Sequence, residues 1–199
     1  MNALKAPAKK KRAIEAVVIG ASAGGVYALL ALLADLPRSF RLPVIVVLHL
    51  PENRDSQLTE IFQYRLPIAV RQAADKESIA PATLYFAGPG YHLSVEMDRT
   101  FSLSCEEALH FSRPSVDILM ESAADAYGAA LAGILLTGAN EDGAAGMARI
   151  KQQGGLTVVQ DPVEAEVPTM PEAAIFRQAP DFILKLAGIR DFLLKLDRA

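Results

Sequence analysis

An apolar run enters a glycine-rich corner and a second apolar run leaves it in residues 16–34, AVVIGASAGGVYALLALLA. The first run is rich in Val and Ile, which is typical of a strand buried on both faces of a parallel sheet. The second run is rich in Ala and Leu and therefore predicts a helix. A buried strand that turns directly into a helix favours the α/β class.

The corner carries a single hydroxyl, Ser22, within Gly20-Ala21-Ser22-Ala23-Gly24. This is the G-x-S-x-G spacing, in which a serine lies on a sharp strand-to-helix turn with its oxygen exposed. Small neighbours let the backbone turn tightly and let a substrate carbonyl approach. Amide groups at the start of the following helix would face a developing negative charge. Ser22 is therefore a candidate nucleophile.

Phosphate or dinucleotide binding is an alternative interpretation of the same corner, because glycine-rich strand-to-helix turns also cradle pyrophosphate. A Walker loop needs Lys and then Ser or Thr after its last glycine, whereas Val26 and Tyr27 follow Gly25. A dinucleotide fold places an acid near the end of its second strand, where this chain has His49. The short apolar run before the corner disfavours a signal peptide, and its glycines disfavour a membrane span.

Further strands and helices alternate along the rest of the chain, which predicts an open, doubly wound and mainly parallel sheet with helices on both faces. Short alternating runs in the middle of the chain suggest a small antiparallel insertion or edge. The expected parallel strands include residues 44–49, 68–73, 132–137, 156–160 and 182–186. The expected antiparallel strands are residues 83–87, 91–96 and 100–105, and Ser115 is expected to cap a helix of about twelve residues.

Composition limits the function further. The chain has 199 residues and a net charge of −3, so we expect one catalytic domain over residues 14–199 behind a flexible basic tail (1–13), with no nucleic-acid partner. The single cysteine, Cys105, fits a reducing compartment, which predicts a cytoplasmic protein. No metal site is expected, because the histidines and the cysteine lack the short spacings that zinc sites use.

Three polar residues follow the ends of three different parallel strands: Ser22, His49 and Asp142. Those ends share one rim of an open α/β sheet, so the three side chains can converge. A serine nucleophile needs a base, and a histidine base needs an acceptor that fixes its tautomer. The order Ser, His, Asp differs from the Ser, acid, His order of the α/β-hydrolases, so the G-x-S-x-G match does not assign that superfamily.

Several blocks, in order over nearly the whole chain, resemble the catalytic domain of the CheB family, the protein-glutamate methylesterases of bacterial chemotaxis. The blocks are VVIGASAGG (17–25), VLHLP (47–51), AGPGYHL (87–93), SRPSVDILMESAA (112–124), GILLTGANEDGAAGM (133–147) and VVQDP…MPEAA (158–174).

The resemblance implies hydrolysis of glutamate γ-methyl esters in a methyl-accepting chemoreceptor or a similar protein, with glutamine deamidation as a further activity and no cofactor. It implies Ser22 as nucleophile, His49 as base and Asp142 as orienting acid.

Backbone amides near Ala23 or from the Gly138–Ala139 turn are candidates for the oxyanion hole. Independently of the resemblance, Arg113 and Asp117 are candidates for a substrate guide and a partner contact, and a structural ion pair or cap explains them equally well.

Thirteen residues of tail cannot contain the receiver domain of the best-known members, so the chain is expected to be a stand-alone domain or a piece of a longer protein, and a separate regulatory protein is a candidate partner. No direct membrane insertion is expected. Two other functions stay open at this point: a catalytically silent, regulatory binding module that retains the fold, and a nucleotide-binding domain.

Overall fold

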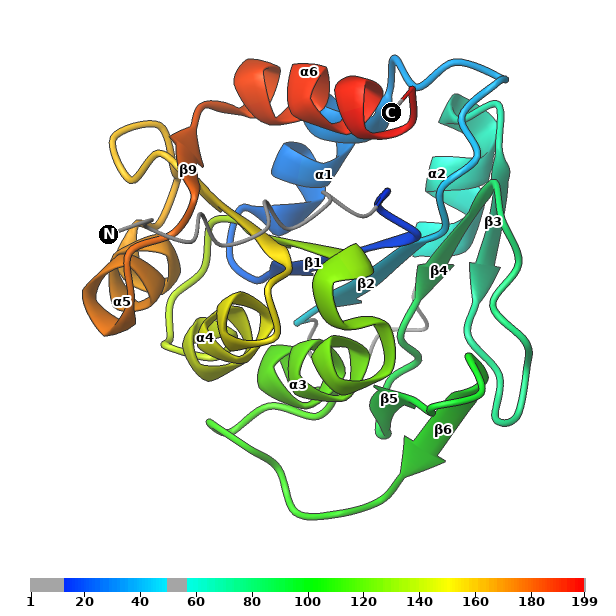
Figure 1. Ribbon diagram of the computed structural model, residues 1–199, viewed down its shortest axis with the longest axis horizontal. Coiled ribbons are helices and arrows are strands. Elements are labelled where there is room, and N and C mark those ends of the chain that lie inside the picture. Colours follow the sequence, from blue (N-terminus) through cyan, green and yellow to red (C-terminus); the bar gives the residue numbers. More distant parts are fainter. Residues whose placement is uncertain (1–12, 50–56, 199) are drawn as a thin grey trace, which may run out of the picture.

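The computed structural model describes residues 13–49 and 57–198. Seven parallel strands form one sheet in the order β3-β4-β2-β1-β7-β8-β9 (Figure 1). The strands are β1 (Ala16–Ala21), β2 (Val44–Leu48), β3 (Ala69–Gln72), β4 (Thr83–Phe86), β7 (Leu131–Leu135), β8 (Leu156–Gln160) and β9 (Phe182–Leu184). The reversal of strand order at β1 places the glycine-rich corner at the point where α/β sheets bind ligands.

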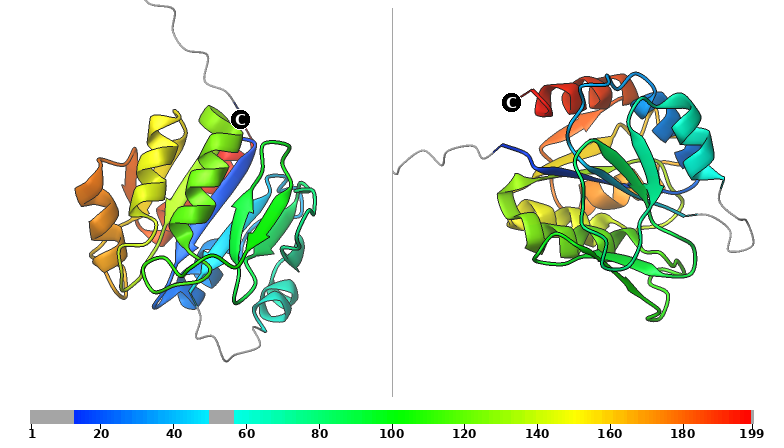
Figure 2. Two further views of the ribbon diagram at one scale, coloured as in Figure 1. Left: turned by 90° about the horizontal axis from the view of Figure 1, so that it is seen from below. Right: turned by 90° about the vertical axis from the view of Figure 1, so that its right-hand side faces the viewer.

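Helices cover both faces of the sheet (Figures 1 and 2). One face carries α1 (Gly25–Leu33), α2 (Leu58–Arg65) and α6 (Leu186–Leu196), and the other carries α3 (Val116–Tyr127), α4 (Ala144–Gln152) and α5 (Thr169–Arg177). Along β1, Val17 and Ile19 pack into the first core, while Ala16 and Val18 pack into the second. Both faces of β1 are therefore buried, which explains its uninterrupted apolar sequence.

The doubly wound parallel sheet is confirmed, and so is a small antiparallel pair, β5 (His92–Val95) with β6 (Phe101–Ser104). The prediction that residues 83–87 belong to the antiparallel part is wrong, because β4 pairs in parallel with β2 and β3. All four residues of β4 are buried, so its apparent alternation does not mark a solvent-facing side. Ser115 caps α3 as expected, accepting a hydrogen bond from the Ile118 N–H at 3.5 Å.

The start of α3 packs directly against the end of β1. A Cβ atom on Gly20 would lie 2.2 Å from Val116 Cγ1, so only glycine permits this approach. The first turn of α3 is therefore held beside the corner that carries Ser22.

The predicted basic tail lies in residues 1–13, almost all outside the described residues, and the division of the chain into tail and domain stays a prediction. No helix within the described residues is both long and apolar enough to cross a membrane.

Candidate active site

Ser22 and His49 are neighbours across two paired strands. Ala21 of β1 is in register with Leu48 of β2, and the His49 N–H donates to the Ala21 carbonyl at 3.1 Å. On the other side, the Ser22 N–H donates to the carbonyl of Thr137, just after β7, at 2.9 Å. The backbone therefore fixes Ser22 between the ends of its two neighbouring strands.

The corner leaves polar groups available around Ser22. Gly24 takes a φ of +76° ahead of α1, and no side chain caps this helix start. Within the described residues, neither the Ser22 hydroxyl nor the Ala23 N–H makes a hydrogen bond. A free hydroxyl next to free helix-start amides suits a nucleophile whose product carries negative charge.

Asp142 is fully buried and binds four donors. Its Oδ2 accepts hydrogen bonds from His49 Nε2 at 2.9 Å and from the Val116 N–H at 2.8 Å. Its Oδ1 accepts from the Ser115 hydroxyl and the Asp117 N–H, both at 2.8 Å. The carboxylate therefore joins the base to the first turn of α3.

The surroundings of Asp142 keep its carboxyl ionised. Burial by itself would raise the pKa of Asp142, but the hydrogen bonds from His49, the Asp117 and Val116 N–H groups and Ser115 outweigh it and lower the pKa below its ordinary value. The positive end of the α3 dipole acts in the same direction. A buried negative charge thus lies against the imidazole of His49.

The second ring nitrogen of His49, Nδ1, lies on the side of the ring toward the loop between β6 and α3. Because Nε2 lies against a carboxylate, we assign the ring proton to Nε2, which leaves Nδ1 as the acceptor. Among the residues that the structure describes, the Ser112 hydroxyl is the hydrogen-bonding partner of Nδ1, at 3.4 Å. This distance exceeds that of a strong O–H···N contact, so Nδ1 remains available as a base.

Arg113 and Ala139, two further candidates from the sequence, make no hydrogen bond to the three candidate catalytic side chains among the described residues. Arg113 directs its guanidinium to the carbonyls of Cys105 and Glu106, at 3.2 and 3.0 Å, and so braces the loop between β6 and α3. Ala139 is exposed and follows Gly138, whose N–H donates to the Val167 carbonyl at 3.1 Å.

Sequence reasoning missed Thr137, and it placed Asp117 in the first turn of a helix without predicting its contact with Asp142. Thr137 orders the corner, since its hydroxyl donates to the Ala23 carbonyl at 2.9 Å. Asp117 is buried beside Asp142, and its burial raises its pKa to about 6 even though it accepts from the Gly146 N–H at 2.7 Å. His110 lies 3.4 Å from the Asp117 carboxylate. No local pattern predicts that Asp117 lies beside Asp142, because the two are brought together by the packing of α3.

His110, Asp117 and Asp142 place ligand atoms within 4.8 Å of one another and form a possible cation site. Both oxygens of Asp142 already accept two hydrogen bonds each. A cation here would have to displace His49 or the donors of α3, so the donor set fits an imidazole better than a metal.

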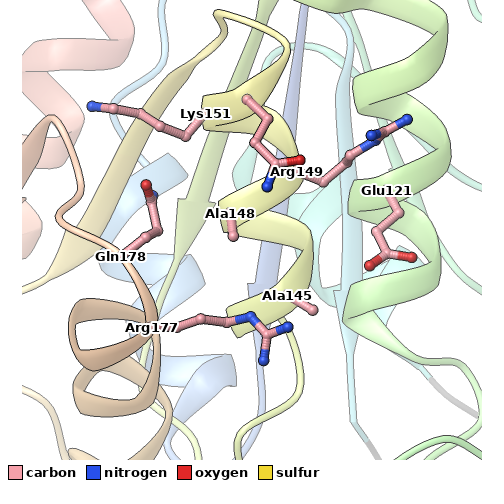
Figure 3. A pocket seen from close by; sticks show the side chains of 8 residues that line it. Glu121, Ala145, Ala148, Arg149, Lys151, Arg177 and Gln178 are labelled. Atoms are coloured by element: carbon pink, nitrogen blue, oxygen red, sulfur yellow. The ribbon is translucent and has the colours of Figure 1, made fainter.

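Two pockets flank this region. One of about 290 Å³ is lined by Gly24, Thr137 and Glu166 among others and adjoins the corner of Ser22. The other, about 470 Å³, is lined by residues of α3, α4 and α5, and the side chain of Arg177 extends toward Ala145 of α4 (Figure 3). None of the three candidate catalytic side chains lines the second pocket, so it does not enter the chemistry below.

Comparisons with known proteins identify the family of the chain. Residues 17–193 match the family model described as CheB methylesterase. A relative from Leptospira interrogans is 44% identical over 92% of this chain and 95% of its own length. The protein-glutamate methylesterase/protein-glutamine glutaminase of Clostridium acetobutylicum is 32% identical over 93% of this chain, but the match spans 54% of that protein.

A solved structure is also similar. The CheB methylesterase catalytic domain of Thermotoga maritima superposes with a TM-score of 0.87 at 29% identity, covering 93% of this chain and 100% of that one. The chain therefore spans about half the length of the Clostridium relative and the whole of the Thermotoga domain.

Proposed function

Because the chain belongs to the CheB methylesterase family, we propose that it hydrolyses the γ-methyl ester of glutamate side chains in a protein, with Ser22, His49 and Asp142 as its catalytic triad. The observation that carries the proposal is the buried Asp142 carboxylate, 2.9 Å from Nε2 of His49. The backbone of His49 is in turn hydrogen-bonded to Ala21, the residue before Ser22. The proposal rests on the residue types and on this connection.

In the first half of the reaction, His49 Nδ1 takes the proton of the Ser22 hydroxyl as the oxygen attacks the ester carbonyl. The tetrahedral intermediate carries its negative charge near the Ala23 N–H and the start of α1, which are the proposed oxyanion donors. The imidazolium then gives its proton to the departing methoxide, and methanol leaves a glutamyl-serine ester.

In the second half, water replaces methanol. His49 accepts a proton from the water as it attacks the acyl-serine, and returns that proton to Ser22 when the ester breaks. The products are a free glutamate side chain and the original enzyme. Asp142 keeps the proton on Nε2 and stabilises the imidazolium in both halves, which is why its own pKa must stay low.

The same steps would release ammonia from a glutamine side chain, because only the leaving group differs. The name of the Clostridium relative includes protein-glutamine glutaminase, so we propose deamidation as a second activity of this site. A methylated chemoreceptor or a similar protein is the proposed substrate, and the cytoplasm is the proposed location. A regulatory protein on a separate chain is the proposed control.

The test is methanol release from membranes that contain a glutamate-methylated receptor. We expect release by the unmodified chain and none by folded Ser22→Ala. A fluorophosphonate should label the protein, and peptide mass spectrometry should find the adduct on Ser22. An adduct on Ser112, the other hydroxyl near His49, would overturn the assignment of the nucleophile. No turnover and no labelling would favour a silent binding module.

A further inference from the structure

The loop between β6 and α3 carries a tight turn at residues 109–112, along the lower edge of Figure 1. Leu109 and Ser112 exchange two backbone hydrogen bonds across it, at 2.9 and 3.2 Å. The two residues between them, His110 and Phe111, have φ values of +50° and +61°. Glycine, asparagine and aspartate are the usual residues here, and a bulky side chain in this conformation is strained.

Phe111 gains no packing in return for this strain. Its relative exposure is 104%, so the ring is entirely in solvent. A large aromatic side chain that is both strained and fully exposed adds nothing to folding. Strain of this kind is characteristic of positions that serve binding or catalysis.

The turn is braced rather than loose. His92 is buried, with Nε2 3.0 Å from the Glu107 carbonyl and Nδ1 accepting from the Ser115 N–H at 3.1 Å. Arg113 donates to carbonyls on the opposite side of the loop. The ring of Phe111 is therefore presented on a preorganised support, which reduces the entropy lost when a partner binds.

The same turn is attached to the catalytic residues. The side-chain amide of Asn140 donates to the His110 carbonyl at 3.3 Å, two residues before Asp142. Ser112, which follows Phe111, has its hydroxyl 3.4 Å from His49 Nδ1. Phe111 is thus one residue away from a direct contact with the base.

We propose that Phe111 is a substrate-recognition residue that binds an apolar side chain of the polypeptide flanking the esterified glutamate. This rests on the proposed function, since it concerns how a protein substrate reaches that site. At protein interfaces a few side chains, with aromatic ones prominent among them, carry most of the binding energy. Phe111 would therefore affect protein substrates and leave the chemical steps unchanged.

The experiment compares two substrates and two phenylalanines. The substrates are membranes with a glutamate-methylated receptor and N-acetyl-glutamate γ-methyl ester amide, which has no flanking polypeptide. Phe111→Ala should lower kcat/KM for the receptor by about tenfold or more through KM, and change the small ester less than twofold. Phe176→Ala, which removes a 95% exposed ring on α5, is the matched control and should change neither.

A second variant separates recognition from folding. Phe111→Asn puts a residue that tolerates positive φ at this position, so its thermal midpoint should not fall while receptor turnover falls as in Phe111→Ala. Equal activity of Phe111→Ala and the unmodified chain on the receptor would overturn the inference alone. An equal loss on both substrates would also overturn it, because it would show a structural role. Failure of the unmodified chain on both substrates would refute the proposed function and this inference with it.

Discussion

The substitution Asp142→Asn tests both tasks of this carboxylate at once. An asparagine has one oxygen and one NH2 group where aspartate has two oxygens. With the amide oxygen toward His49 and Val116, the NH2 group meets the Asp117 N–H, and with the amide reversed it meets the Val116 N–H. In either orientation a backbone donor of α3 loses its acceptor in a fully buried position.

The expected loss of stability follows from these contacts. A buried donor left without a partner costs about 1–3 kcal/mol, and removing a charge from a helix N-terminus costs about 0.3–1 kcal/mol more. We therefore expect Asp142→Asn to lower the free energy of unfolding by about 1–4 kcal/mol. The control Asp125→Asn removes an exposed carboxylate that pairs with Arg149, and it should cost less than about 1 kcal/mol.

The expected loss of activity has a different origin. The favoured amide orientation has the oxygen toward His49, because fewer donors then face the NH2 group. The proton on His49 Nε2 is therefore retained, and the loss of activity reflects the missing negative charge. A carboxylate and an imidazolium whose charges are about 4 Å apart attract by about 4 kcal/mol at an effective dielectric constant of 20. That energy corresponds to a decrease in kcat on the order of a thousandfold.

Urea unfolding and methanol release from the same preparation measure the two effects. A loss of stability with normal turnover would show that Asp142 only caps α3, and the triad assignment would be wrong. Unchanged stability together with a loss of turnover would show that the hydrogen bonds to Val116 and Asp117 contribute nothing, which would refute the reasoning above.

Three further predictions concern the same region. Ser22→Ala and His49→Ala should each lower kcat by roughly a thousandfold or more with unchanged circular dichroism, and near-normal turnover in either would contradict the triad. The pKa of Asp117 is raised from 3.8 to about 6, so between these pH values the folded state holds a proton on Asp117 that the unfolded state has lost. Proton binding therefore stabilises the folded state at pH 4, and this stabilisation is lost as the pH rises to 7. Asp117→Asn should therefore remove up to about 3 kcal/mol of pH dependence from urea unfolding measured at those two pH values, and an unchanged pH profile would refute the shift. Gly20→Ala would place a methyl group 2.2 Å from Val116 Cγ1, so the thermal midpoint should fall by an amount equivalent to about 1–3 kcal/mol, and a midpoint within one degree of the unmodified chain's would contradict that packing.

Much of the fold follows from local sequence patterns. The apolar runs of β1, β2, β7 and β8 are continuous because both faces of these strands are buried, and their pattern predicts parallel strands. Ser115 predicts the start of α3 because capping depends on neighbouring residues alone. The sequence pattern of β4 predicts an antiparallel strand, whereas β4 pairs in parallel with β2, because a run of four residues does not determine which strands it pairs with.

The candidate site was predictable only in outline. Because Ser22 and His49 follow the ends of two parallel strands, the sequence predicts that they lie on one rim of the sheet. The pairing of Ala21 with Leu48 brings the two residues next to each other. That Asp142 would bind the first turn of α3, 25 residues earlier in the chain, depends on tertiary packing at Gly20 and on no local pattern. The strained turn at Phe111 was not predictable either, because the sequence there contains no glycine or asparagine, the residues that usually indicate positive φ values.

The shared use of Asp142 has a consequence for how relatives of this chain are interpreted. A descendant that lost catalysis would still need this acid to begin α3, so selection for folding alone would preserve it. Retention of the aspartate is then poor evidence that a relative is an active enzyme. The hydroxyl of Ser22 makes no hydrogen bond within the described part of this chain, so selection for folding alone would not preserve the serine. The serine position is therefore the one that should distinguish working esterases from inactive relatives.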